Sequence, residues 1–203
     1  MDGAKCRHRR GRRILSMTGQ FPLLQSALSR CPVCGSDRFG YKDVLWRELI
    51  QEWDLSDEEI STINRQQGLY CEACGNNLRS MALANAILKS CGCGGPLTDF
   101  VRSDSARLLS CLEINESGHL TSVLADLPNH CLIRYPDCDM MNLDFPDSSF
   151  DLVIHSDTLE HVPRPVAGLS ECRRVLSSSG RCLFTVPVLP GRLSRSRDRK
   201  SVV

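Results

Sequence analysis

The sequence predicts an α/β protein: a doubly wound, mostly parallel sheet that is left incomplete, preceded by a small cysteine-bounded module with helices. After residue 96, short apolar runs alternate with helical patterns, which is typical of a parallel sheet covered by helices. Before residue 96, two Cys-x-x-Cys-Gly segments bound a separate region. Between the two regions, the segment CGCGGP at 91–96 interrupts any regular element, so we place the domain boundary there.

Composition is that of an ordinary folded protein. The chain has 203 residues, a formal net charge of +1, 41% hydrophobic and 24% charged residues. These values fit one large or two small domains, and no apolar run approaches the roughly 20 residues that cross a bilayer. The 12 cysteines come without an export signal, which argues against a disulfide framework and favours a reducing, cytoplasmic setting.

Both ends of the chain are expected to lie outside the folded parts. Residues 1–30 begin with a strongly basic stretch and indicate a disordered tail with a short helix at 23–28, or an upstream start with Met17 as the true initiator. At the other end, DRKSVV resembles a translated sequencing adapter. We therefore expect residues 191–203 to be an artefactual tail and the chain to be cut short near Arg197.

Helices are expected within the cysteine-bounded module, residues 31–95. Residues 41–53 have helical apolar spacing, and residues 78–89 are rich in the helix formers Ala, Leu and Met. Ser56 followed by Glu59 is a capping-box signature that opens a helix through residue 66, and Gly68 ends it.

The two Cys-x-x-Cys-Gly segments predict a metal centre. Two residues between paired thiolates let both sulfurs reach one ion, and the trailing glycine permits the necessary backbone turn. Two such segments supply four thiolates, the complement of a closed, structural zinc site. The predicted ligands are Cys31, Cys34, Cys71 and Cys74. Two unrelated buried pairs or redox dithiols are the alternative.

The other cysteines outside the N-terminal tail fall into two groups. Cys91 and Cys93 are spare candidates for a metal role. The remaining ones that we assign stand in apolar surroundings and are expected to fill the core: Cys111, Cys131, Cys172 and Cys182.

The region from 96 to 190 predicts a partial domain of alternating elements. Strands are expected at 108–114, 131–135, 150–155 and 181–186, with helices at 118–127 and at 163–176.

The stretch DMMNLDFPDSSFDLVIHSDTLEHV at 139–162 carries the strongest functional signal. An acidic residue precedes a Phe-Pro-Asp turn, and an apolar strand then ends in small and acidic residues where a ligand can approach. ECRRVLSSSGRCLFTVP follows, with a helix end, a glycine turn and another apolar strand. The pair resembles the second half of the cofactor-binding core of class I S-adenosylmethionine-dependent methyltransferases of type 11. The resemblance covers residues 108 to about 187.

The resemblance implies a Rossmann-like methyltransferase sheet that binds S-adenosylmethionine at the carboxyl ends of its strands. Glu113 matches the acidic residue at the end of the first strand, and Gly118 is the one glycine that remains of the usual loop. Asn115 tolerates left-handed backbone geometry and Ser117 is small, so the turn can form.

The resemblance also assigns the adenine contacts. Asp139 and Met140 match the positions that contact adenine through the carboxylate and the next backbone amide, although Asp139 could instead be a solvated turn residue. The second and third strands are compressed into one short passage before Asp139. Tyr135 and Asp137 are therefore the candidates for the acidic ribose position.

Ser156, Asp157 and His161 follow the fourth strand, where cofactor and substrate meet in an open α/β sheet. Methyl transfer is a displacement at a sulfonium, so the enzyme mainly aligns the reactants and adds a base for a hydroxyl or amine nucleophile. His161, in the family's Leu-Glu-His-Val context, is the candidate base. A histidine that only shapes the pocket is the alternative.

The sequence therefore predicts a zinc-containing methyltransferase that transfers a methyl group to an oxygen or nitrogen nucleophile, with this chain, as a fragment, a poor enzyme. The alternative is a non-catalytic, zinc-containing binding or scaffold protein with a degenerate methyltransferase fold, which the depleted glycine loop favours. We expect a polar small-molecule or sugar substrate ahead of a protein, and no membrane partner. Residues 31–95 lack a basic stripe with interleaved aromatics, which argues against nucleic acid.

Overall fold

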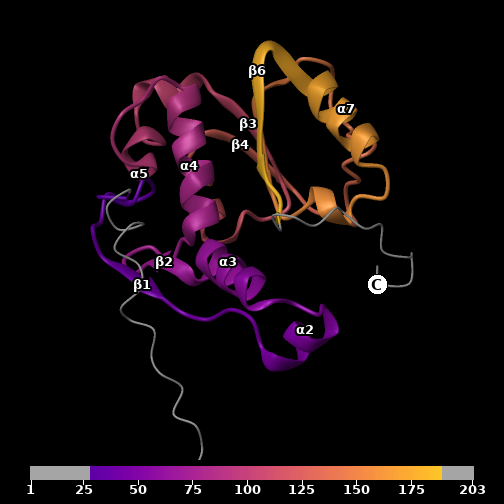
Figure 1. Ribbon diagram of the computed structural model, residues 1–203. Coiled ribbons are helices and arrows are strands. Elements are labelled where there is room, and N and C mark those ends of the chain that lie inside the picture. The colour runs from indigo at the N-terminus through magenta and orange to yellow at the C-terminus, as the bar shows by residue number, and fades with distance from the viewer. Residues whose placement is uncertain (1–27, 189–203) are drawn as a thin grey trace, which may run out of the picture.

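The computed structural model describes residues 28–188, which form a parallel sheet with a helix on each face and a cysteine-rich module at one end (Figure 1). The predictions for the N-terminal tail and its short helix, and for the C-terminal tail, fall on residues outside this range, apart from residues 28–30. Among the described residues, no helix combines the length and apolarity needed to cross a membrane.

The sheet has four strands in the order β4-β3-β5-β6. They are β3 (Ser110–Ile114), β4 (Asn129–Ile133), β5 (Phe150–Ser156) and β6 (Leu176–Thr185). Every pairing is parallel, so all carboxyl ends meet at one edge. The parallel Rossmann-like sheet predicted from the sequence is therefore confirmed.

Strand β6 begins at Leu176 instead of at residue 181 as predicted. Its pairing with β5 shifts register between Phe150 and Leu152. Gly180 lies in the irregular part, where a Cβ atom would come within 3.0 Å of the Phe150 carbonyl oxygen. The absence of a side chain there lets the extra residues of β6 stay against β5.

One long helix covers each face of the sheet: α4 (Leu78–Ser90) on one side and α7 (Pro165–Val175) on the other (Figure 1). Because side chains alternate along a strand, β5 supplies both layers. Leu152 and Ile154 belong to the core cluster on the α4 side, whereas Val153 belongs to the cluster on the α7 side.

The cysteine-rich module contains a two-stranded antiparallel sheet and two helices. Strand β1 (Phe39–Tyr41) pairs with β2 (Leu69–Cys71), and α2 (Arg47–Glu52) and α3 (Asp57–Gly68) lie between them in the chain. The predicted capping box is confirmed: the Ser56 hydroxyl accepts the Glu59 N–H at 3.3 Å, and the Glu59 carboxylate accepts the Ser56 N–H at 2.8 Å. Gly68 is the last residue of α3, as predicted.

The prediction of one helix over 41–53 was wrong in extent, because Tyr41 belongs to β1 and the helix begins at Arg47. The reason lies in a tertiary contact. The Asn64 side-chain oxygen accepts the backbone N–H of Val44 at 2.9 Å and that of Leu45 at 3.3 Å. These two donors are thereby tied to α3, which holds the intervening segment outside a helix.

The helix predicted at 118–127 is also shorter than expected. It consists of a 3-10 turn η2 (Gly118–Leu120) and one turn of α-helix, α6 (Thr121–Leu124). Short helical turns at α5 (Leu97–Phe100), η1 (Asp104–Leu108) and η3 (Leu159–His161) complete the described elements.

The core continues across the boundary predicted after residue 95. One hydrophobic cluster contains Cys31 and Val33 of the first Cys-x-x-Cys segment together with Leu152 and Ile154 of the sheet. Backbone hydrogen bonds from Leu97 to Pro32 at 2.8 Å and from Thr98 to Val33 at 3.0 Å join the two regions further. The division into domains stays a prediction, and residues from both sides of the predicted boundary pack in the same hydrophobic cluster.

Candidate functional site

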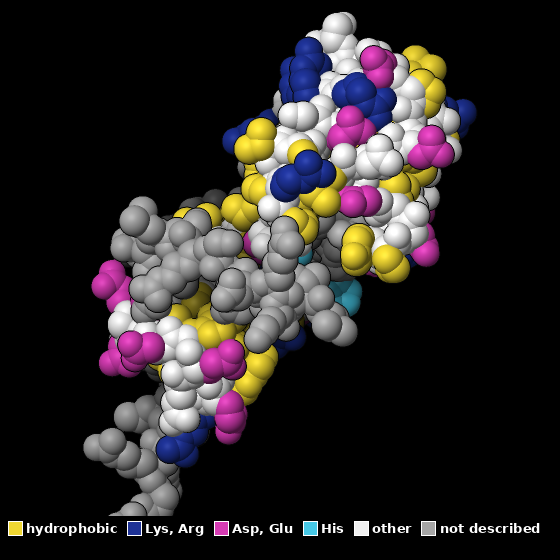
Figure 2. Space-filling view, turned by 90° about the vertical axis from the view of Figure 1, so that its right-hand side faces the viewer, with side chains coloured by type: hydrophobic (Ala, Val, Ile, Leu, Met, Phe, Trp, Pro, Cys, Tyr) yellow, Lys and Arg dark blue, Asp and Glu magenta, His cyan; other side chains and the backbone are white. Residues whose placement is uncertain are grey.

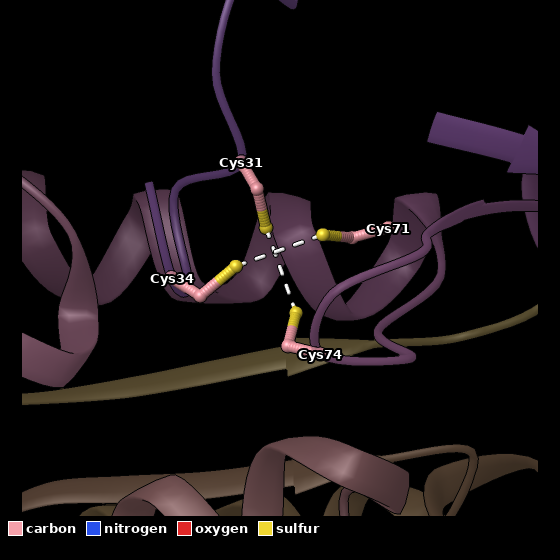
Figure 3. Close-up of side chains that lie close together, drawn as sticks. All are labelled: Cys31, Cys34, Cys71 and Cys74. Carbon is pink, nitrogen blue, oxygen red and sulfur yellow. Dashed lines mark hydrogen bonds between the residues drawn. The ribbon is translucent and has the colours of Figure 1, made fainter. Parts of the chain in front are cut away.

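Four cysteine sulfurs converge in the module (Figure 3). We call Cys31, Cys34, Cys71 and Cys74 the four-cysteine centre; their sulfurs all lie within 4.8 Å of one another. Cys31 Sγ is 3.8 Å from Cys74 Sγ, and Cys34 Sγ is 3.6 Å from Cys71 Sγ. A tetrahedral zinc ion with Zn–S bonds of about 2.3 Å requires sulfurs about 3.8 Å apart. The donor set therefore fits such an ion.

The two Cys-x-x-Cys-Gly segments fold alike. Gly35 has φ +79° and Gly75 has φ +73°, a left-handed conformation that favours glycine. In each segment the glycine N–H donates to the carbonyl of the first cysteine, Cys31 or Cys71, at 2.8 Å. The turn expected from the trailing glycine is thus present twice. Cys91 and Cys93 pack at the margin of the core and do not join this centre.

A pocket of about 310 Å³ opens at the carboxyl edge of the sheet. We call it the edge pocket. Three chain segments line it: the start of α4, the loop after β3 and the end of β5. The lining residues are Asn77, Arg79, Ser80, Asn115, Glu116, Ser117, Gly118, Ser156 and Asp157. Of the predicted cofactor-binding residues, the structure brings together here Asn115, Ser117, Gly118, Ser156 and Asp157.

The loop after β3 adopts the turn expected from its sequence. Asn115 has φ +58° and Gly118 has φ +62°. The Asn115 N–H donates to the Ile133 carbonyl at 2.8 Å, and its side-chain oxygen accepts the Tyr135 N–H at 3.1 Å. Asn115 therefore ties the loop to the end of β4, which fixes one wall of the edge pocket.

Glu113 holds this loop from below and does not line the edge pocket. The side chain is fully buried, and one carboxylate oxygen accepts the Ser117 N–H at 2.8 Å and the Thr121 hydroxyl at 2.6 Å. The other oxygen lies 2.8 Å from His130 Nε2. Burial raises the pKa of Glu113, but the hydrogen bonds from His130, Thr121 and Ser117 outweigh it, so the pKa lies below its ordinary value.

Arg79 is a pocket residue that the sequence did not mark. It extends from α4 and forms an ion pair with Asp157 at the end of β5. The Arg79 side chain is 10% exposed and that of Asp157 is 49% exposed. Asp157 has φ +51°. No motif surrounds Arg79, and only the packing of α4 on the sheet brings it to the loops.

The other predicted site residues lie outside the lining of the edge pocket. The Asp139 carboxylate accepts the Met141 N–H at 2.8 Å, which closes a local turn. The Met140 side chain is buried in the α7-side core. His161 is exposed at the end of η3, and its backbone N–H donates to the Thr158 carbonyl at 3.0 Å. The adenine roles of Asp139 and Met140 and the base role of His161 stay predictions.

Tyr135 and Asp137, the candidates for the ribose position, are both exposed in the segment after β4. Neither lines the edge pocket. Their proposed role also stays a prediction.

Comparison with known proteins adds one family match. Residues 90–184 match the model of a methyltransferase domain, a segment that runs from the end of α4 through most of β6. A search of curated proteins found no match.

The fold is also similar to solved structures at low identity. A putative methyltransferase from Bacillus halodurans C-125 shares 18% sequence identity, and the match covers 47% of this chain and 51% of that structure with a TM-score of 0.37. A putative S-adenosyl-L-methionine-dependent methyltransferase from Methanococcus maripaludis shares 14% identity, and the match covers 49% of this chain and 55% of that structure with a TM-score of 0.34. A putative sarcosine dimethylglycine methyltransferase from Galdieria sulphuraria shares 14% identity, and the match covers 68% of this chain and 59% of that structure with a TM-score of 0.41. The chain spans little more than half the length of these structures.

Proposed function

We propose that this chain carries the cofactor-binding part of an S-adenosylmethionine-dependent methyltransferase that acts on an oxygen or nitrogen nucleophile. One observation carries the proposal. Residues chosen from two separate motifs, after β3 and after β5, meet in one pocket at the carboxyl edge of a parallel sheet, where ligands bind in open α/β folds. The match of residues 90–184 to a methyltransferase domain supports the same activity.

The edge pocket suits the cofactor's charges. Its volume of about 310 Å³ lies at the lower end of the range of roughly 300–1,000 Å³ for ligand pockets. Arg79 offers a cation for a carboxylate, and Asp157 offers an anion for an ammonium or sulfonium group.

The chain's residues would mainly position and shield the reactants. When bound, the cofactor supplies the electrophilic methyl group. Asn115 and Glu113 hold the loop that would face the cofactor. His161 keeps its proposed role as the base that takes a proton from a hydroxyl or amine acceptor, and Asp139 and Met140 keep their proposed adenine contacts.

We also propose a structural zinc ion at the four-cysteine centre. Four protein ligands leave no open position, so the ion would stabilise the fold and take no part in the reaction. The centre stands next to the edge pocket along the chain: Cys74 is followed closely by Asn77, whose side chain caps α4 by accepting the Ser80 N–H at 2.9 Å. The ion would thereby fix the start of the helix that carries Arg79.

A contact between Gly75 and His119 links the two sites a second time. A Cβ atom on Gly75 would lie 3.3 Å from the His119 ring, so the second Cys-x-x-Cys-Gly turn packs directly on η2. Because η2 continues the loop that lines the edge pocket, loss of metal is expected to disturb two walls of the pocket, the start of α4 and the loop after β3.

The acceptor is proposed to be a polar small molecule or a sugar in a cytoplasmic setting. On the face shown in Figure 2, Lys and Arg side chains are interspersed with Asp and Glu and form no single basic patch. Such a surface supports a small polar acceptor over nucleic acid, which requires a basic footprint.

The test is a calorimetric titration of the chain with S-adenosylmethionine. Arg79→Ala is expected to weaken binding by about 1.5–3 kcal/mol, the range for a hydrogen bond to a charged group, which corresponds to roughly 10-fold to 150-fold in Kd. Arg102→Ala is the matched control, because Arg102 pairs with Asp126 on the surface away from the edge pocket. If the wild-type chain binds neither S-adenosylmethionine nor its demethylated product, the non-catalytic scaffold function replaces this proposal.

A further inference from the structure

A second group of metal-ligating side chains lies on the α7 face of the sheet. It consists of His155 on β5, Cys182 on β6 and Cys172 on α7, and we call it the His155 cluster. One ring nitrogen and the two sulfurs all lie within 4.8 Å of one another. His155 follows Ile154 in β5, so it points away from the α4-side core. None of the three lines the edge pocket.

The imidazole ring of His155 is buried, and its nitrogens could bind a ligand. Its side chain is 0% exposed, and neither ring nitrogen has a hydrogen-bond partner outside this cluster in the described part of the chain. One face of the ring stacks on Phe184, with centroids 4.7 Å apart and planes at 10°. A buried polar group without a partner is destabilising, so a histidine here is poorly explained by packing alone.

We propose that His155, Cys172 and Cys182 form a second metal site, for a thiophilic ion of the Zn²⁺ or Cu⁺ class. Two thiolates and an imidazole are the ligands that such ions prefer. The ion neutralises the charge of the buried thiolates, and one ring nitrogen of His155 coordinates it. The cysteines predicted to be core fillers at positions 172 and 182 thereby gain a chemical role.

The position of the cluster provides an access route. Cys182 is half-buried on β6, the last strand of the described sheet, and Phe184 is 40% exposed beside it. Three protein ligands leave one position of a tetrahedral zinc ion open, in contrast to the closed four-cysteine centre. A three-coordinate Cu⁺ ion would need no further ligand.

The test is the metal content of the full chain, purified without oxygen in reducing buffer and loaded with Zn²⁺ or with Cu⁺ in separate samples. The wild-type chain is expected to hold about two equivalents of at least one of these ions, one in each site. Cys172→Ala, Cys182→Ala and His155→Phe are each expected to hold about one. The Phe variant keeps an aromatic ring against Phe184 and removes both ring nitrogens.

Cys111→Ala is the matched control, because Cys111 is a buried thiol on β3 that belongs to neither metal-ligating group. It is expected to keep about two equivalents. Cobalt substitution gives a second readout, since the thiolate-to-cobalt absorption of the wild-type chain should fall in the two cysteine variants. The proposal is overturned if the wild-type chain holds one equivalent with both ions, or if the three variants retain two. A Cys172–Cys182 disulfide under these reducing conditions would overturn it as well.

Discussion

The four-cysteine centre and the edge pocket are joined by one short stretch of chain, residues 71–80, yet they are built in different ways. The centre uses two local turns, each with its own glycine and its own pair of thiols. The edge pocket takes its walls from α4, from the loop after β3 and from the end of β5. A local turn is specified by a few neighbouring residues, whereas such a pocket exists only after the sheet and α4 have packed.

This difference sets an order of dependence between the two regions. Asn77, three residues after Cys74, caps the start of α4, and Gly75 packs on His119 in η2. Damage to the centre should therefore reach the edge pocket, whereas changes in the pocket should leave the centre intact. The predictions below test that asymmetry, from the largest expected effect to the smallest.

Cys71→Ser is expected to have the largest effect, because it removes one of four ligands from a centre whose folding is coupled to metal binding. In zinc-finger peptides that binding is worth roughly 10–16 kcal/mol, so loss of the bound ion and unfolding of residues 31–90 are expected. Elemental analysis and thermal unfolding measure both, and S-adenosylmethionine titration reports the edge pocket. Cys91→Ser, at a half-buried thiol outside the centre, is the control. A metal-free protein with an unchanged Tm would contradict a structural zinc.

Glu113→Ala is expected to destabilise the sheet domain by about 3 kcal/mol, because it leaves the Thr121 hydroxyl and the His130 ring without their acceptor and the Ser117 N–H with only Thr121 Oγ1. The metal content should stay unchanged if the centre folds independently of the loop. Chemical denaturation and elemental analysis provide the two readouts. Glu116→Ala is the control, because that neighbouring carboxylate is exposed and pairs with Arg134 at the surface; it should change stability little. Loss of metal in Glu113→Ala would reverse the order of dependence.

Glu113 should also produce a specific acid response. Its pKa is lower in the folded protein than in the unfolded chain, where it is about 4.3. The stability that it contributes is therefore present above about pH 4.3 and is lost as the pH falls through the lowered folded value. Denaturation curves measured across this range should show a shallower decline for Glu113→Gln than for the wild-type chain. Equal slopes would show that Glu113 does not govern the acid response.

Ser56→Ala should have the smallest effect, because it removes only the capping box of α3. A loss of about 1 kcal/mol is expected, measured by denaturation. Ser61→Ala is the matched control, since Ser61 is an exposed residue within the same helix. If the local parts of the module fold as units, neither substitution should alter the metal content. A loss of metal from Ser56→Ala alone would extend the coupling from the centre into α3.

Several features of the fold were predictable because their signals are local. The capping box at Ser56, the left-handed turns at Gly35 and Gly75, and the apolar run of β5 each depend on residues close together in the chain. The helix predicted over 41–53 failed for the opposite reason. A single distant side chain, Asn64, takes the backbone donors of Val44 and Leu45, and no local pattern reveals such a competitor.

The candidate site divides along the same line. The sequence alone was enough to select the four cysteines and the residues at the ends of β3 and β5. Ligand spacing and strand ends can both be recognised from residues that are close together in the chain. Tertiary structure decided that Arg79 meets Asp157, that Glu113 supports the loop from within, and that His155 lies beside Cys172 and Cys182. The first and third of these contacts join residues far apart in the chain, and only the packing of α4 and α7 on opposite faces of the sheet brings their side chains together. The contacts of Glu113 are nearer in the chain, to Ser117, Thr121 and His130, and depend on how the loop after β3 folds beside β4.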